Sequence, residues 1–98
     1  MRWLPLLALL ATGCLSFHEG AMTGEPSDAT FASVDGARVR FVDEGEGSAV
    51  VLIHGFSSSL ETWDTVRPAL AESHRVLALD LKGFGWTDRP QGDYSPQA

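Results

Sequence analysis

The apolar residues of this 98-residue chain follow the pattern of a strand, a helix and a second strand between residues 49 and 81. Residues 49–53 are continuously apolar and rich in β-branched side chains, which predicts a parallel strand buried on both faces. Residues 75–81 predict a second buried strand, with Asp80 at its carboxyl end. Between the strands, the apolar positions lie near one face of a helix; they are Leu60, Trp63, Val66 and Leu70. The pattern therefore predicts an α/β architecture with one βαβ unit.

The ends of the predicted helix carry two local signals. Ser58 with Glu61 three residues later predicts a capping box at the amino end. Pro68 removes an amide donor, so it predicts either a kink or a restart with Pro68 in a first turn.

A β-hairpin is predicted ahead of the βαβ unit. Residues 30–34 alternate weakly, Asp35-Gly36 is a strong two-residue turn, and residues 38–42 alternate polar with apolar. This pattern is typical of a half-solvated antiparallel hairpin at the edge of a sheet.

The first residues have the form of an export signal. Arg2 precedes a short apolar run that ends in the small residues Thr12 and Gly13. The run is shorter than the roughly 20 residues of a membrane-spanning helix, so we expect residues 1–13 to be a signal peptide.

Cys14 is the only cysteine in the chain, and residues 10–14 resemble a bacterial lipobox. The resemblance implies that Cys14 carries a lipid that anchors the exported chain in a membrane. Leu15 gives no acidic retention signal, so in a two-membrane bacterium we expect the cell envelope, at the outer membrane or periplasmic face. The alternative is an ordinary cleaved signal with an incidental thiol.

Residues 14–28 contain glycine and proline but no apolar period, which predicts a flexible tether ahead of a domain at residues 29–98. His18 and Glu19 have no further histidine or cysteine nearby, so the sequence predicts no metal site. Without residues 1–13, six Lys and Arg face thirteen Asp and Glu, a net charge of −7. With no basic cluster, we expect no nucleic-acid partner and no basic patch for anionic lipid.

Two loops follow the predicted parallel strands, at the sheet edge where ligands bind in open α/β folds. The motif His54-Gly55-Phe56 follows the first strand, and residues 80–90 (DLKGFGWTDRP) follow the second. Together they resemble the amino-terminal part of the α/β-hydrolase fold, in the branch of epoxide hydrolases, haloalkane dehalogenases, haloperoxidases and carbon–carbon bond hydrolases. The resemblance covers residues 29–98 and implies a mostly parallel sheet that is incomplete here.

The resemblance also implies roles for individual residues. The backbone N–H of Phe56 is expected to be a donor of the oxyanion hole, supported by His54 and Gly55. Asp80, Gly83 and Gly85 are expected to shape the second loop beside the pocket. The nucleophile, the acid and the catalytic histidine are expected after residue 98, because this fold orders them in that way. Gly83 and Gly85 lack a third glycine and a following helix, so no dinucleotide cofactor is expected.

These expectations describe a lipid-anchored, cofactor-free hydrolase acting on a small apolar ester, epoxide or related substrate. Two alternatives stay open. Ser57 lies between strand and helix as the serine of a nucleophile elbow does, although the second glycine of that motif is absent. The chain could also be a non-catalytic lipoprotein module that uses the same loops for binding.

Overall fold

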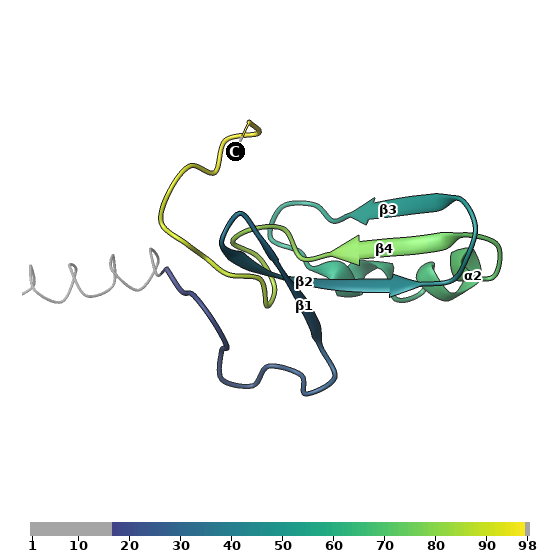
Figure 1. Ribbon diagram of the computed structural model, residues 1–98, viewed down its shortest axis with the longest axis horizontal. Coiled ribbons are helices and arrows are strands. Elements are labelled where there is room, and N and C mark those ends of the chain that lie inside the picture. Colours follow the sequence, from purple (N-terminus) through teal and green to yellow (C-terminus); the bar gives the residue numbers. More distant parts are fainter. Residues whose placement is uncertain (1–16, 98) are drawn as a thin grey trace, which may run out of the picture.

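The computed structural model describes residues 17–97, so the export signal and Cys14 lie outside the described residues. The elements are, in order, β1 (Thr30–Val34), β2 (Ala37–Glu44), β3 (Ala49–Ile53), the 3-10 helix η1 (Leu60–Trp63), α2 (Arg67–Ala71) and β4 (Arg75–Leu79). They form a four-stranded mixed sheet in the order β1-β2-β4-β3 (Figure 1). β3 and β4 are parallel, whereas β1 with β2 and β2 with β4 are antiparallel. The predicted hairpin and βαβ unit are thus confirmed as part of an α/β fold.

The core lies between β4 and the two short helices. The register pairs Val50 with Val76 and Leu52 with Ala78, which places all four on one face of the sheet. Val76 and Ala78 are fully buried there, and Leu60 of η1 is 1% exposed. Both helices lie against β4, and Figure 1 shows α2 over one face of the sheet. β4 is buried because it has a strand on each side and helices over one face.

The expectation that β3 is buried on both faces is wrong. Val51 and Ile53 are 54% and 58% exposed, and they lie on the face opposite the helices. β3 is an edge strand of the sheet. Among residues 17–97, nothing covers the face of β3 that carries Val51 and Ile53. The sequence of β3 is therefore typical of a fully covered strand, but the described part of the chain covers only half of it.

The predicted capping box is also wrong. η1 begins at Leu60, and its N-cap residue Ser59 makes no capping hydrogen bond through its side chain. The N–H of Leu60 instead donates to Oδ1 of Asp80 at 2.7 Å, while the carboxylate of Glu61 pairs with Arg40. A carboxylate from another loop satisfies this helix end, so no local cap is required.

The second helix follows the restart that Pro68 predicts. α2 begins at Arg67 and has Pro68 in its first turn, where a missing N–H costs no hydrogen bond. The predicted apolar face is only partly buried, because Val66 falls between the two helices and is 43% exposed.

The hairpin turn has the expected geometry. Asp35 and Gly36 both have positive φ, 49° and 80°, as a type I′ turn requires. β2 continues beyond the hairpin, and residues Phe41–Glu44 pair with β4. The hairpin is thereby joined to the βαβ unit through one long strand.

Residues 17–28 belong to the segment expected to be a tether, and they lie against the loop that follows β4. The backbones of His18 and Arg89 exchange two hydrogen bonds, with N···O distances of 2.9 and 2.6 Å. Glu25 forms a bidentate ion pair with Arg38, with both N···O distances at 2.8 Å. The chain therefore contacts the folded domain from residue 18 onward.

Candidate functional site

The first loop, residues 54–59, leaves the carboxyl end of β3 as a tight turn. The carbonyl oxygen of Gly55 accepts the N–H of Ser58 at 3.2 Å, and Ser57 has a φ of 60°. Positive φ at the third position only is the mark of a type II turn, with Phe56 at the second position. The side chain of Phe56 is 93% exposed. Among the hydrogen bonds of residues 17–97, none engages the N–H of Phe56.

His54 connects this loop to the second loop, residues 80–90. Its ring is buried; Nε2 accepts the N–H of Leu81 at 2.9 Å, and Nδ1 lies 2.8 Å from the carbonyl oxygen of Gly55. Because Nε2 accepts, the proton sits on Nδ1 and donates to Gly55. Both ring nitrogens are occupied by the two loops, so the ring holds the loops together.

The serine alternative finds no catalytic partner in this geometry. Ser57 makes no side-chain hydrogen bond to a histidine within residues 17–97, and both nitrogens of nearby His54 are bonded to backbone groups. A serine nucleophile needs a base within hydrogen-bond reach.

Asp80 is the buried centre of the second loop. Its Oδ1 accepts the N–H of Leu60 at 2.7 Å, and its Oδ2 accepts the N–H of Trp86 at 2.9 Å. Nη1 of Arg40 lies 3.5 Å from Oδ2. The expected role of Asp80 in its own loop does not include the bond to Leu60, because that partner is twenty residues away in the sequence. One carboxylate therefore fixes both the start of η1 and the second loop.

Thr87 and Asp88 were not anticipated as structural residues, although both are buried. Oγ1 of Thr87 donates to the carbonyl oxygen of Asp80 at 2.7 Å and accepts the N–H of Arg40 at 2.9 Å. The two carboxylate oxygens of Asp88 accept the N–H groups of Gly20 and Arg38, at 2.7 and 2.8 Å. The second loop thereby completes the hydrogen bonding of β2 and of the amino-terminal segment.

The three glycines expected at the site have different surroundings. Gly85 has a φ of 54°, and a Cβ there would clash with the carboxylate of Asp80. Gly83 has a φ of 88°, and a Cβ would lie 2.8 Å from the ring of Tyr94. At Gly55 a Cβ would meet no atom within 4 Å. The second loop therefore requires its glycines for packing, whereas Gly55 faces open space.

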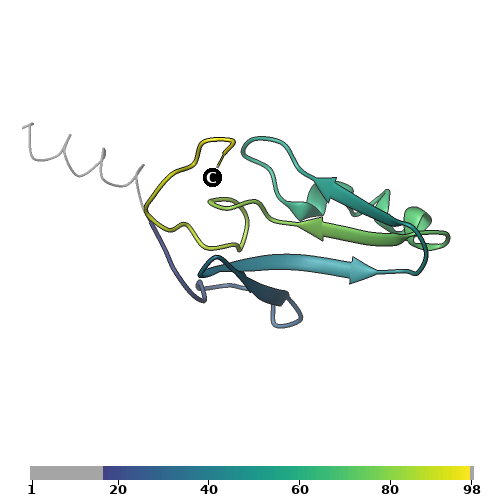
Figure 2. The same cartoon turned by 45° about the horizontal axis from the view of Figure 1, so that its top comes forward.

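A cavity of about 500 Å³ opens beside Phe56. Its lining is largely apolar and aromatic: Phe56, Leu81, Lys82, Phe84, Tyr94, Ser95 and Pro96. The rings of Phe56 and Phe84 meet edge to face, with centroids 5.7 Å apart. Figure 2 shows the segment after β4, in yellow, returning past the carboxyl ends of β3 and β4. The cavity volume lies in the range of roughly 300–1,000 Å³ that is usual for ligand pockets.

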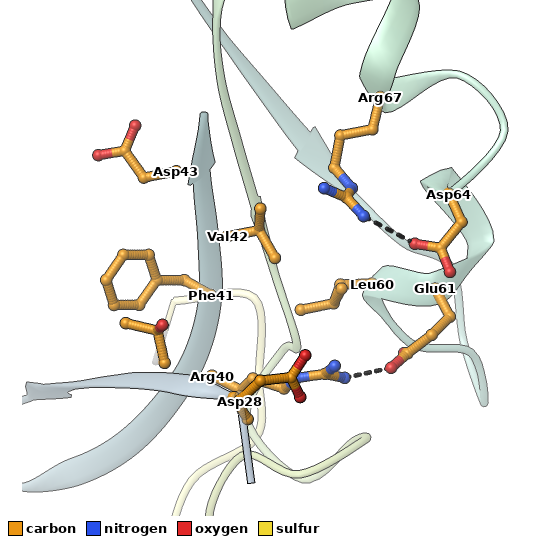
Figure 3. Close-up of a pocket in the computed structure, with 11 residues that line it drawn as sticks. Asp28, Arg40, Phe41, Val42, Asp43, Leu60, Glu61, Asp64 and Arg67 are labelled. Carbon is orange, nitrogen blue, oxygen red and sulfur yellow. Dashed lines mark hydrogen bonds and ion pairs between the residues drawn. The ribbon is translucent and has the colours of Figure 1, made fainter. Parts of the chain in front are cut away.

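A second cavity, of about 370 Å³, lies between β2 and η1 and contains none of the expected site residues (Figure 3). Its two cations already have carboxylate partners: Arg40 pairs with Glu61, and Arg67 pairs with Asp64. It also lies on the helix-covered side of β2. Its two arginines are therefore neutralised by carboxylates of the protein itself.

Within residues 17–97 no three histidine, cysteine or acidic side chains gather in a way that could hold a metal ion. No helix in that part of the chain combines the length and apolar character needed to cross a membrane.

Comparison with known proteins gives a consistent result. The chain is 38% identical over 68 residues to 2-hydroxy-6-oxo-6-(2'-aminophenyl)hexa-2,4-dienoic acid hydrolase of Metapseudomonas resinovorans, covering 66% of this chain and 23% of that protein. It is 42% identical over 59 residues to the soluble epoxide hydrolase of Corynebacterium sp. strain C12, covering 60% and 21%. An alpha/beta hydrolase fold protein from Burkholderia ambifaria superposes with a TM-score of 0.62 at 33% identity, covering 78% of this chain and 27% of that one.

The chain spans about a fifth of the length of the curated relatives it matches. Residues 48–96, half of the chain, match the family described as alpha/beta hydrolase fold. This segment contains β3, β4 and both loops of the candidate site. The sequence match and the structural superposition agree, and the chain belongs to the alpha/beta hydrolase fold family.

Proposed function

We propose that this chain supplies the oxyanion-hole loop of a cofactor-free hydrolase that acts on a small apolar ester, epoxide or related substrate. The observation that carries the proposal is the N–H of Phe56, which has no acceptor among residues 17–97 and sits in a turn fixed by His54 and Ser58. A preorganised backbone donor of this kind stabilises negative charge that develops on a substrate oxygen.

The space around the donor suits an apolar substrate. Gly55 leaves room beside the turn, and the aromatic cavity begins at Phe56 itself. A substrate with an apolar body could rest against Phe84 and Tyr94 while its reacting oxygen faces the N–H of Phe56. Phe56 would then be the one catalytic residue of this chain, with His54, Gly55, Asp80, Gly83 and Gly85 as supports.

The remaining groups belong to a proposed continuation of the chain. The match covers only 21–23% of the length of these relatives, and in this fold the nucleophile, the acid and the histidine occur in that order. We expect a Gly-x-(Ser/Asp/Cys)-x-Gly elbow and a later histidine in the gene beyond codon 98. A serine would favour ester or carbon–carbon bond hydrolysis, and an aspartate would favour epoxide or haloalkane substrates. Absence of both features would support the non-catalytic binding module instead.

The donor itself can be tested with one substitution and its control. Pro is favoured at the second position of a type II turn, so Phe56→Pro in the complete enzyme removes the N–H while preserving the turn. We expect kcat to fall on the order of 100- to 1,000-fold, the usual effect of losing one oxyanion donor. Phe56→Ala keeps the N–H and should retain kcat within about tenfold. Equal losses in the two variants would contradict the proposed donor.

The membrane anchor rests on the sequence around Cys14. His18 is bonded to Arg89, so only residues 15–17 lie between the proposed lipid and the folded domain, a span of at most about 14 Å. An anchored chain would therefore hold the carboxyl edge of the sheet close to the headgroups. The wild-type chain should partition into detergent and gain the mass of a diacylglyceryl group, and Cys14→Ser should abolish both. A water-soluble wild type with a free thiol would rule out the anchor.

A further inference from the structure

One arginine of the described chain, Arg89, lacks the carboxylate partner that the others have, and the proposed hydrolase function does not explain this difference. Residues 17–97 contain five arginines, and four of them form ion pairs with carboxylates. The pairs are Arg38 with Glu25, Arg40 with Glu61, Arg67 with Glu44, and Arg75 with Asp43. Figure 3 shows Arg40 facing Glu61, and Arg67 facing its second carboxylate partner, Asp64. Arg89 has no such partner among the described residues.

The guanidinium of Arg89 is also poorly satisfied by hydrogen bonds. Its one bond within residues 17–97 runs from Nη2 to the carbonyl oxygen of Gly85, at 3.4 Å. Its Nε is buried and has no acceptor in that part of the chain. The adjacent carboxylate of Asp88 is already used by the N–H groups of Gly20 and Arg38. A buried guanidinium donor without an acceptor is costly unless a ligand completes it.

A separate cavity of about 390 Å³ lies beside this guanidinium. It is lined by Met22, Ser59, Glu61, Gly85, Trp86 and Arg89. Met22 and Trp86 supply apolar surface, and Ser59 supplies a hydroxyl. The one acidic residue, Glu61, is held by Arg40. The cavity therefore offers one unpaired cation next to an apolar wall.

The position of Arg89 is fixed by its backbone. It exchanges two hydrogen bonds with His18, and the segment that begins at His18 also brings Met22 to the cavity. Gly24 packs against the same indole, since a Cβ at Gly24 would lie 3.7 Å from the ring of Trp86. The amino-terminal segment and the second loop thus build the cavity jointly, away from the aromatic cavity at Phe56.

We propose that this cavity binds a small organic carboxylate, with the carboxylate held by Arg89 and the apolar body resting between Met22 and Trp86. The planar guanidinium fork matches a carboxylate in two parallel hydrogen bonds, and its weak hydration suits a partly buried site. An apolar body would also displace water from the indole and the thioether. The site is distinct from the proposed oxyanion hole and does not depend on hydrolysis.

Benzoate and its neutral isostere benzamide are suitable probes for the whole chain, with titration calorimetry as the readout. We expect benzoate to bind and Arg89→Gln to weaken it about tenfold or more, since charge-assisted hydrogen bonds are lost. Arg89→Lys, which keeps the charge but not the fork, should fall between the two. Arg75→Gln removes a surface arginine that is paired with Asp43, and it should bind benzoate as the wild type does.

Four results would overturn the proposal: no detectable benzoate binding, equal binding of benzamide, equal losses in Arg75→Gln and Arg89→Gln, or inorganic phosphate binding as tightly as benzoate. If inorganic phosphate bound as tightly as benzoate, the apolar surface of Met22 and Trp86 would contribute nothing to binding. Circular dichroism of each variant shows whether it is folded. If Arg89→Gln is unfolded, the comparison of Arg89→Lys with the wild type decides the question. Binding is measured without turnover, so a failure of the proposed hydrolase activity would leave these results unaffected.

Discussion

The first and second loops leave the same edge of the sheet, but the protein holds them in opposite ways. In the second loop, the side chains of Asp80, Thr87 and Asp88 are buried, and each is bonded to backbone groups of other segments. In the first loop, Phe56 is almost fully exposed and Gly55 faces open space. Among the described residues, His54 forms the only hydrogen bond between the two loops, and the ring of Phe56 adds an edge-to-face contact with Phe84.

The two loops therefore have different roles at the carboxyl edge of the sheet: one stabilises the fold and the other offers a hydrogen-bond donor. The second loop is a rigid base, because its buried carboxylates and hydroxyl are satisfied only in one arrangement. The first loop keeps an N–H and open space available, which the described chain itself does not use. A substitution in the second loop should therefore change stability, and one in the first loop should change chemistry.

Asp80 should give the largest loss of stability. Asp80→Ala leaves the N–H groups of Leu60 and Trp86 without an acceptor and leaves Arg40 with Glu61 alone as a carboxylate partner. Removing one partner from a buried charged network costs about 3–5 kcal/mol, so we expect a loss of that order in the free energy of unfolding, measured in urea. Asp80→Asn keeps one acceptor and should lose less. Wild-type stability in Asp80→Ala would contradict the central role of this carboxylate.

The glycines provide a matched pair for the two loops. Gly85→Ala places a Cβ at positive φ and against the carboxylate of Asp80, so it should lower the unfolding free energy by about 2 kcal/mol or more. Gly55→Ala meets open space and should change it by less than about 0.5 kcal/mol. Thermal unfolding of both variants checks the difference, and similar losses would show that the two loops are equally constrained.

Thr87 tests the hydrogen bonding between the second loop and β2. Thr87→Val keeps the shape but leaves the N–H of Arg40 and the carbonyl oxygen of Asp80 unsatisfied. Leaving such groups buried without a partner costs about 1–3 kcal/mol. Thr87→Ser keeps the hydroxyl and should restore most of this loss. If serine and valine destabilise equally, packing rather than hydrogen bonding is what Thr87 contributes.

The ion pair of the amino-terminal segment should give the smallest effect, and one that depends on pH. The hydrogen bond from Arg38 lowers the pKa of Glu25 below its usual value of 4.5. A carboxyl whose pKa is lower in the folded state stabilises the fold above the unfolded pKa, and this contribution disappears as the pH falls through the folded pKa. Glu25→Gln should therefore differ from wild type at neutral pH and approach it as the pH falls below 4.5 and through the lowered pKa of Glu25, as followed by urea unfolding. A difference that persists in acid would assign the effect to packing.

Local patterns predicted much of the fold because they report local physics. The Asp35-Gly36 turn and the Pro68 restart are set by the allowed φ of a few residues, and both are confirmed. The capping box failed because a longer-range acceptor, Asp80, reaches the end of η1 first. Thr87 and Asp88 belong to the motif of the second loop, but the motif does not reveal their partners, which lie in β2 and in the amino-terminal segment.

The sequence by itself determined the order of elements, the parallel pairing of β3 with β4 and the two loops at their carboxyl ends, because periodicity and turn chemistry act within short stretches. It also determined that β3 is apolar on both faces. Only the tertiary structure decided which of those faces is covered, which carboxylate satisfies which amide, and which arginine lacks a partner. These are contacts between distant segments, and no pattern along one segment specifies the group that another segment brings to it.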